Sequence, residues 1–192
     1  AVNALSNYFK VQAFRDSKTK VAEFSQGNLS DESKIIKGSE ENGTLIEFEP
    51  DNSIFKNYKF RPDYVENQLW NYAYLNAGLK INFNNKVIYS KNGLLDLLEK
   101  KTNPEQLRYP IIHLKGEDIE IALTHGQQYG EEYYSFVNGQ NTTQGGTHLQ
   151  AYRESIVGTI RNFYNKSFDS KDIHASIIGA ISIRVEEPVF ES

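Results

Sequence analysis

The chain has 192 residues, 39% hydrophobic, 12% aromatic and 24% charged, which is the composition of an ordinary folded protein. It contains no cysteine, which excludes disulfides and thiolate metal sites, and its formal net charge of −4 argues against a surface that binds nucleic acid throughout. No run of about 18 apolar residues and no signal-peptide pattern occurs, so we expect a cytoplasmic protein that does not enter a membrane.

The first third of the chain is predicted to form antiparallel strands. Apolar and polar residues alternate over residues 8–14, and a polar turn leads into a second strand over residues 19–24. A further strand is expected over residues 44–49, and the polar stretch between residues 25 and 42 contains one short candidate strand. We therefore expect a sheet built around three antiparallel strands.

The middle of the chain combines helices with a hairpin. Asp63 is predicted to be the N-cap of a helix that ends at the Asn-Ala-Gly of residues 76–78. Strands over residues 79–83 and 87–89 flank an Asn-Asn turn, and a short helix follows over residues 94–101. Residues 102–106, which include an Asn-Pro pair, are the best candidate for a linker.

The last third begins with strands over residues 111–115, 118–124 and 132–137. The longest helix is predicted over residues 147–165, with a capping box formed by Thr147 and Gln150. A final strand, residues 176–185, is almost continuously apolar, which predicts burial on both faces. The mixed order of elements indicates an α+β fold. The apolar face of the long helix comprises Leu149, Tyr152, Ile156, Val157, Ile160, Phe163 and Tyr164.

Familiar catalytic and metal-binding patterns do not occur. The sequence has no G-x-S-x-G elbow and no Walker-type loop, and Glu131 and Glu132 are interpreted as solvated turn residues. We therefore expect neither a catalytic residue nor a metal site in this chain. The four histidines are scattered without metal-binding spacing, at His113, His125, His148 and His174.

Residues 136–148 read F-V-N-G-Q-N-T-T-Q-G-G-T-H, which places a polar, glycine-containing loop between a strand end and a helix start. The glycines tolerate positive φ, and free N–H groups of a first helical turn can bind an anion, although a purely structural turn explains the same residues. The string resembles the F-V-N-x-x-x-T-x-x-G-G-T-H signature of the transducer domain in type IIA DNA topoisomerase B subunits. The residues that carry the resemblance are Asn138, Gly145, Gly146, Thr147 and His148.

The resemblance extends over effectively the whole chain. V-N-A-L-S at residues 2–6 is similar to the segment after the glycine-rich ATP lid of the GHKL ATPase domain, and G-T at residues 43–44 is similar to that domain's last nucleotide-binding motif. F-R-P-D at residues 60–63 and L-N-A-G-L-K-I at residues 75–81 match further family segments. Residues 172–192 resemble the strand that leads to the catalytic Q-T-K loop.

This resemblance implies a division into two domains. Residues 1–103 would form the distal half of a GHKL ATPase α/β sandwich, and residues 104–192 a transducer domain with a ribosomal-protein-like βαβ fold, truncated before the Q-T-K loop. In this alignment the ATP lid, the general-base glutamate, the magnesium-binding asparagine and the Q-T-K lysine lie outside the chain. The absence of methionine, even at position 1, also suggests a piece of a longer product, with initiator removal as the alternative. We expect an inactive fragment with no bound nucleotide.

The resemblance also implies the sites. Gly43, Thr44 and Ile46 would contact ATP, with Thr44 reaching the adenine through an aspartate and a water, and Ile46 packing on the base. The alternative is that Thr44 merely starts a strand and Ile46 is core. Arg153 would face the DNA cavity, with Lys166 and Lys171 near the helix end, and a solvated helix face is the alternative there.

The whole protein would couple ATP, bound with magnesium, to DNA strand passage in the nucleoid. Its expected partners are DNA, the topoisomerase A subunit and a second copy of the B subunit. His174 stands where relatives usually carry arginine, and N-T-T-Q at residues 141–144 favours topoisomerase IV over gyrase. Two alternatives stay open: a nucleic-acid or protein-binding module that shares the transducer fold without ATPase chemistry, and a fragment with only a structural role.

Overall fold

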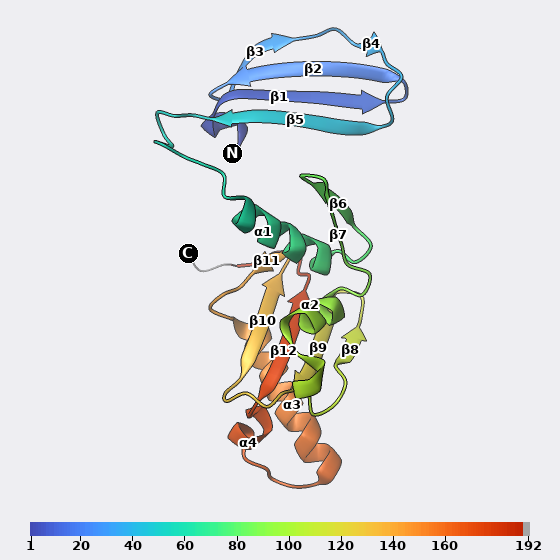
Figure 1. Ribbon diagram of the computed structural model, residues 1–192, viewed down its shortest axis with the longest axis vertical. Helices are drawn as coiled ribbons and strands as arrows, with labels where there is room; N and C mark the ends of the chain where they lie inside the picture. The colour runs from blue at the N-terminus through green and yellow to red at the C-terminus, as the bar shows by residue number, and fades with distance from the viewer. Residues whose placement is uncertain (190–192) are drawn as a thin grey trace. The chain divides into compact units, whose positions relative to one another are not determined.

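The computed structural model describes residues 1–189 and divides into two compact units, Ala1–Arg61 and the residues from Pro62 onward (Figure 1). Residues 190–192 belong to the segment compared with the strand before the Q-T-K loop, and this part of that comparison lies outside the described residues. Among residues 1–189, no helix is long and apolar enough to cross a membrane.

The first unit is a five-stranded antiparallel sheet in the order β3-β2-β1-β5, with β4 paired to β2. The predicted hairpin is present, and Asp16 and Ser17 take positive φ at its turn. The sequence predicts three main strands and one short strand, but the polar stretch between residues 25 and 42 forms two short strands. The elements are η1 (Asn3–Leu5), β1 (Ser6–Arg15), β2 (Lys18–Ser25), β3 (Asn28–Glu32), β4 (Ile36–Lys37) and β5 (Gly43–Pro50).

One face of this sheet is apolar and lacks a covering layer within the unit. Phe9 of β1 lies opposite Phe24 and Phe48, and the Phe9 and Phe24 rings meet edge to face at 6.1 Å. In residues 1–61, all of which the structure describes, no apolar side chain is buried. We call this surface the apolar face, and its residues are Phe9, Val11, Ala22, Phe24, Ile46 and Phe48.

The second unit contains the remaining elements. A five-stranded sheet has the order β11-β10-β12-β9-β8, in which β12 runs parallel to β10 and antiparallel to β9. Because α3 lies between the two parallel strands in the chain, β10, α3 and β12 form a βαβ unit. The elements are α1 (Pro62–Leu75), β6 (Lys80–Phe83), β7 (Lys86–Tyr89), α2 (Leu94–Lys101), η2 (Pro104–Gln106), β8 (Ile112–Lys115), β9 (Ile119–His125), β10 (Glu132–Val137), β11 (Gln140–Asn141), α3 (Thr147–Tyr164), α4 (Ser170–His174) and β12 (Ile177–Ile183).

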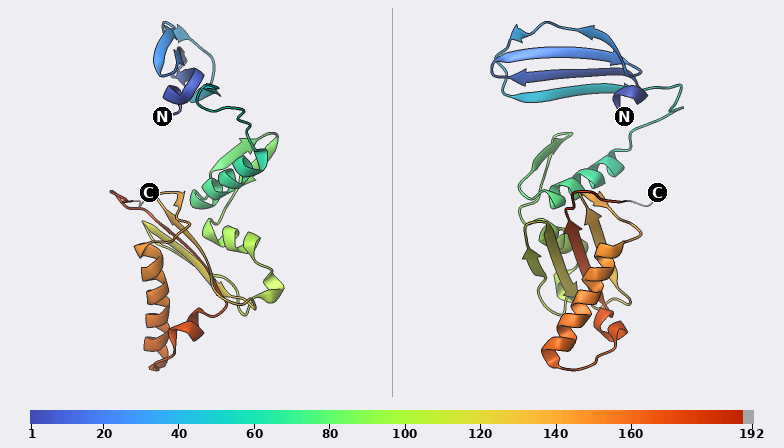
Figure 2. Two further views of the ribbon diagram at one scale, coloured as in Figure 1. Left: turned by 90° about the vertical axis from the view of Figure 1, so that its left-hand side faces the viewer. Right: turned by 180° about the vertical axis from the view of Figure 1, so that it is seen from behind.

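Helices cover both faces of this sheet, with α2 on one side and α3 on the other (Figure 2, left). On the α3 side the Tyr152 hydroxyl donates to the Ala122 carbonyl at 3.1 Å. A Cβ at Gly179 would lie 3.0 Å from the Tyr133 ring and from the Tyr152 hydroxyl, so a larger residue there would require these side chains to shift. The predicted burial of β12 on both faces is confirmed. The core on the α2 side comprises Tyr74, Leu94, Leu97, Leu98, Ala122, Phe136, Ile178 and Ala180.

Two predicted helix caps were wrong. Helix α1 begins at Pro62, which places Asp63 in the first turn instead of at the N-cap. The N-cap of α3 is Gly146, which has no side chain to accept a hydrogen bond, and the Gln150 amide donates to Glu154 at 2.9 Å. The proposed capping box is therefore absent, and the glycine pair determines where α3 starts.

The end of α3 also differs from the prediction. Phe163 and Tyr164 were assigned to the buried face, but they are 79% and 59% exposed and contact each other edge to face at 4.9 Å. The short helix α4 was not predicted, because five residues are too few for a periodic apolar pattern. The candidate linker forms η2, with Asn103 as its N-cap, inside the second unit. The assignment of residues 1–103 and 104–192 to two family domains stays a prediction.

Candidate functional sites

The three residues compared with an ATP site lie on β5, an outer strand of the first unit's sheet. Thr44 lies opposite Ala13, and Ile46 lies opposite Val11, so both side chains project from the apolar face. The Ile46 side chain is 55% exposed. A hydroxyl and a branched aliphatic group are therefore presented side by side to whatever covers this part of the sheet.

Gly43 begins β5 where the chain itself does not require a glycine. Its φ is not in the left-handed region, and a Cβ added there would lie 3.9 Å from the Glu41 carbonyl oxygen, an ordinary contact. A side chain at this position would fit the described chain. The absence of one leaves the start of β5 open to close approach by another group.

These residues fit one edge of a base-binding pocket and no more. Gly43, Thr44 and Ile46 carry no charge, so they suit the adenine of a nucleotide better than its phosphates. In the described part of the chain, no three His, Asp or Glu side chains converge on a possible metal position.

The second candidate is the loop between β10 and α3, where the motif residues lie close together. Asn138 and Gly139 take φ values of 48° and 80° in the turn after β10. The Asn138 side chain donates to the Val185 carbonyl at 2.8 Å and accepts from the Val185 N–H at 2.9 Å. Asn138 thus holds the chain as it leaves β12.

The threonine and histidine of the motif connect this loop to the start of α3. The Thr142 hydroxyl lies 2.6 Å from the Ser135 hydroxyl and 3.2 Å from His148 Nε2. Burial lowers the pKa of His148, so its ring stays neutral near pH 7. The glycines at the helix start have φ values of 78° (Gly145) and 147° (Gly146), and Thr147 is the first residue of α3. These contacts give Asn138, Thr142 and His148 structural roles in the loop.

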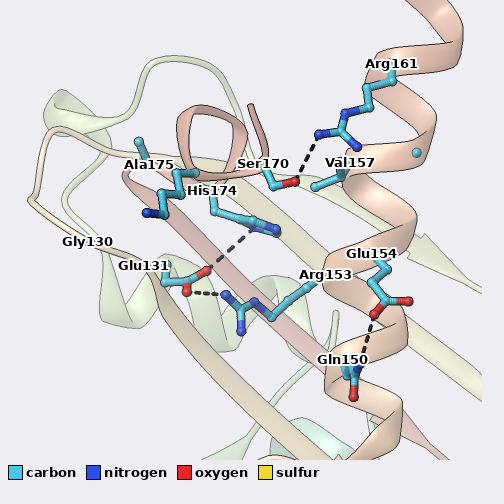
Figure 3. A pocket seen from close by; sticks show the side chains of 12 residues that line it. Gly130, Glu131, Gln150, Arg153, Glu154, Val157, Arg161, Ser170, His174 and Ala175 are labelled. Carbon is cyan, nitrogen blue, oxygen red and sulfur yellow. Dashed lines mark hydrogen bonds and ion pairs between the residues drawn. The ribbon is translucent and has the colours of Figure 1, made fainter. Parts of the chain in front are cut away.

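The third candidate is a pocket of about 820 Å³ between α3, α4 and the residues before β10 (Figure 3). It brings together Arg153 and Lys171, two of the three residues compared with a DNA-binding surface. Lys166 does not line this pocket, since it follows the end of α3, where its N–H donates to the Arg161 carbonyl at 3.2 Å. The predicted DNA contacts are therefore only partly clustered.

Arg153 is half-buried and its charge is paired. One guanidinium nitrogen donates to Glu131, and the group lies over the Tyr133 ring with its carbon 5.5 Å from the centroid. The other Glu131 oxygen lies 3.6 Å from His174 Nδ1, and the Tyr133 hydroxyl lies 3.0 Å from the same nitrogen. Burial raises the pKa of Tyr133 and lowers that of His174, so we assign a protonated phenol and a neutral imidazole.

Glu131 was missed as a site residue. Its position in a polar stretch before a strand predicts a solvated turn residue, yet Glu131 contacts both Arg153 and His174. The separation of 22 residues between Glu131 and Arg153 follows no helical or strand period. The contact arises only because α3 packs beside the start of β10, so no local signal could have revealed it.

Comparisons with known proteins cover the whole chain. The family model described as DNA gyrase B matches residues 80–192. The B subunit of DNA topoisomerase 4 from Borreliella burgdorferi is 42% identical over 192 residues, which are 100% of this chain and 32% of that protein. The DNA gyrase B subunit of Thermotoga maritima is 30% identical over 216 aligned positions, which cover 99% of this chain and 34% of that protein. The chain spans about a third of the length of these relatives.

Solved structures show the same fold. The 43K ATPase domain of Thermus thermophilus gyrase B, in complex with an aminocoumarin, superimposes with a TM-score of 0.80 and 27% identity. That match covers 98% of this chain and 58% of the other. The Francisella tularensis topoisomerase IV ATP-binding domain, at 24% identity and a TM-score of 0.78, agrees in fold over 100% of this chain and 57% of its own. The chain therefore belongs to the DNA gyrase B family, the B subunits of type IIA DNA topoisomerases.

Proposed function

We propose that this chain is part of a topoisomerase IV B subunit that couples ATP binding and hydrolysis to DNA strand passage. The observation that carries the proposal is the 42% identity to the B subunit of a topoisomerase 4 along all 192 residues. The identity to the Thermotoga maritima gyrase protein is lower, at 30%. Topoisomerase IV is therefore favoured over gyrase, and relaxation and decatenation are the expected reactions of the whole protein.

Residues 1–103 would supply the distal half of the GHKL sandwich. The uncovered apolar face supports this assignment, because a sheet with one apolar face is stable only when a second layer covers it. Thr44 and Ile46 project from that face, so a nucleotide held between the layers would contact them through its base. When bound, ATP with its magnesium ion supplies the hydrolysable phosphate. The residues of this chain would only bind and orient the adenine.

Residues 104–192 would form the transducer, which relays nucleotide state to the DNA gate. Its βαβ unit and the clamp of Asn138 on Val185 make a rigid connection between the two strands. Arg153, Lys166 and Lys171 would contact phosphates of the captured DNA without reading its sequence. The topoisomerase A subunit and a second copy of the B subunit complete the proposed assembly.

The proposal is tested on the full-length protein with its A subunit and on this chain alone. We expect the complex to relax and decatenate DNA only with ATP and magnesium, and the chain alone to hydrolyse no ATP. A complex that acts on DNA without ATP, or not at all, would overturn the function and favour a binding module. ATP hydrolysis by the chain, at a rate unchanged by further purification, would overturn the placement of the catalytic groups outside it.

A further inference from the structure

The pocket between α3 and α4 contains cationic side chains and two carboxylates, which differ in their hydrogen-bond and ion-pair partners (Figure 3). Glu131 is bound by Arg153 and faces His174, whereas the Glu154 carboxylate accepts from the neutral Gln150 amide. Within residues 1–189, no ion pair joins Glu154 to a cation, and no ion pair joins Lys171 to a carboxylate. Among the carboxylates of residues 1–189, Glu131 is therefore the one that neutralises a cation of this pocket.

The pair between Glu131 and Arg153 is incomplete in geometry. The Arg153 Nε is buried without an acceptor, so only part of the guanidinium fork is satisfied. Both side chains remain partly open to solvent, at 40% exposure for Arg153 and 33% for Glu131. An exposed pair of this kind gains little stability over its separated, solvated partners, so another anion can displace the carboxylate.

A phosphate group suits the position that the Glu131 carboxylate occupies on the Arg153 guanidinium. Guanidinium binds carboxylate and phosphate with the same two-pronged geometry, so a phosphodiester oxygen can take the place of the Glu131 carboxylate on the Arg153 Nη that it occupies. The pocket, at about 820 Å³, has ample room for one phosphodiester, and Lys171 on its wall adds a second cation. Arg161 is less available, because it donates to the Phe168 carbonyl and to the Ser170 hydroxyl.

We propose that this pocket is a subsite for one phosphate of the DNA backbone, and that Glu131 closes it by occupying Arg153. The proposal rests on the DNA contact proposed above and adds to it an internal competitor. DNA binding at the subsite exchanges the carboxylate for a phosphate on the same guanidinium. Glu131 therefore weakens DNA binding and reduces its dependence on salt by about one phosphate contact.

The test compares variants of the full-length protein that remove one negative charge from the same pocket. Glu131→Gln frees Arg153, whereas the matched control Glu154→Gln frees no cation. Binding to a short duplex DNA is followed by fluorescence anisotropy over a range of salt concentrations. We expect Glu131→Gln to bind about threefold to fivefold more tightly at low salt. Its plot of log affinity against log salt should steepen by about 0.9, while the slope for Glu154→Gln stays unchanged.

Two further variants separate release of Arg153 from general charge and folding effects. Glu131→Asp keeps the net charge but shortens the reach of the carboxylate, so it should tighten binding by a smaller factor than Glu131→Gln. Adding Arg153→Ala to Glu131→Gln should abolish the gain. Melting temperatures identify any variant that fails to fold, and Glu131→Asp then carries the test.

The outcomes distinguish this inference from the proposed function. Equal slopes for Glu131→Gln and Glu154→Gln, with weaker DNA binding by Arg153→Ala, would overturn the role of Glu131 and leave the DNA contact intact. DNA binding unaffected by Arg153→Ala and Lys171→Ala would overturn the proposed DNA contact and the subsite with it.

Discussion

The two five-stranded sheets of this chain follow the same alternating pattern but differ in what covers them. The β1–β5 sheet buries no apolar side chain, although Phe9, Ile46 and Phe48 share one of its faces. The sheet of the second unit has α2 on one face and α3 on the other, and its strand β12 is buried on both. Alternation in a strand therefore identifies an apolar face, but burial depends on which helices the same chain supplies.

The largest expected effect is the loss of unfolding free energy when an apolar side chain is truncated, and it should differ between the two sheets. Leu98 is 0% exposed beneath the second sheet, whereas Ile46 is 55% exposed on the first. We expect Leu98→Ala to lower the free energy of unfolding by about 2–5 kcal/mol, since it leaves a cavity in a packed core. Ile46→Ala should cost less than about 1 kcal/mol in this chain, because little apolar area is lost from burial. Urea unfolding of the two variants measures both values, and equal costs would contradict the comparison.

A second prediction concerns close packing around β12. Gly179→Ala places a methyl group 3.0 Å from the Tyr133 ring, which should destabilise the second unit by roughly 1–3 kcal/mol. Gly158→Ala on α3 is the control, because no atom lies within 4 Å of its added Cβ, and it should stabilise by up to about 1 kcal/mol. Thermal melting of both variants provides the test. Destabilisation of the Gly158 variant would show that the surroundings of α3 are tighter than described.

The third prediction is functional and addresses the first sheet. In the full-length protein, Thr44→Ala should weaken ATP binding by roughly 1–2 kcal/mol, the usual loss for one buried hydrogen bond. The melting temperature without nucleotide should change little, because Thr44 is exposed in this chain. Calorimetric titration with a non-hydrolysable ATP analogue measures the affinity. An affinity equal to that of the wild type would remove Thr44 from the proposed site.

The smallest effect should appear in the pH dependence of stability, and only in the second unit, which contains all four histidines. Burial lowers the pKa of His148 and of His174 below that of an unfolded histidine, so the unfolded state binds more protons in this range. Their contribution to stability is present above about pH 6.5 and is lost as the pH falls through the folded pKa values. Unfolding measured from pH 7.5 to pH 5 should show this fall, and replacing both histidines by glutamine should flatten it.

Elements with strong local signals were predictable from the sequence. The helix expected over residues 94–101 is α2, Leu94–Lys101, and the hairpin turn at Asn84 and Asn85 takes the positive φ values that these residues tolerate. The predictions failed where structure depends on distant partners. Phe163 and Tyr164 continue the periodic pattern of α3, but periodicity identifies a helix face and does not say how far the covered surface extends.

The candidate sites also differ in whether their contacts join residues that are near or distant in the sequence. Asn138, Thr142 and His148 lie close together in the chain, so their contacts follow from a loop of fixed length between a strand and a helix. The grouping of Glu131, Arg153 and His174 needs the packing of α3 and α4 beside β10. A string of residues can therefore mark the loop, while the charged pocket becomes visible only in three dimensions.

The clamp at Asn138 has a chemical consequence as the protein ages. Asn138 is followed by Gly139, and asparagine before glycine deamidates readily, because the unhindered backbone nitrogen attacks the side-chain amide. The attack expels ammonia and forms a cyclic imide, and water then opens the imide to isoaspartate or aspartate. Either product lacks the amide donor to the Val185 carbonyl and carries a negative charge instead. The two hydrogen bonds to Val185 restrain the Asn138 side-chain amide while the turn is closed. The lifetime of this side chain therefore depends on how often the turn opens, and the extent of deamidation in stored protein would record that opening.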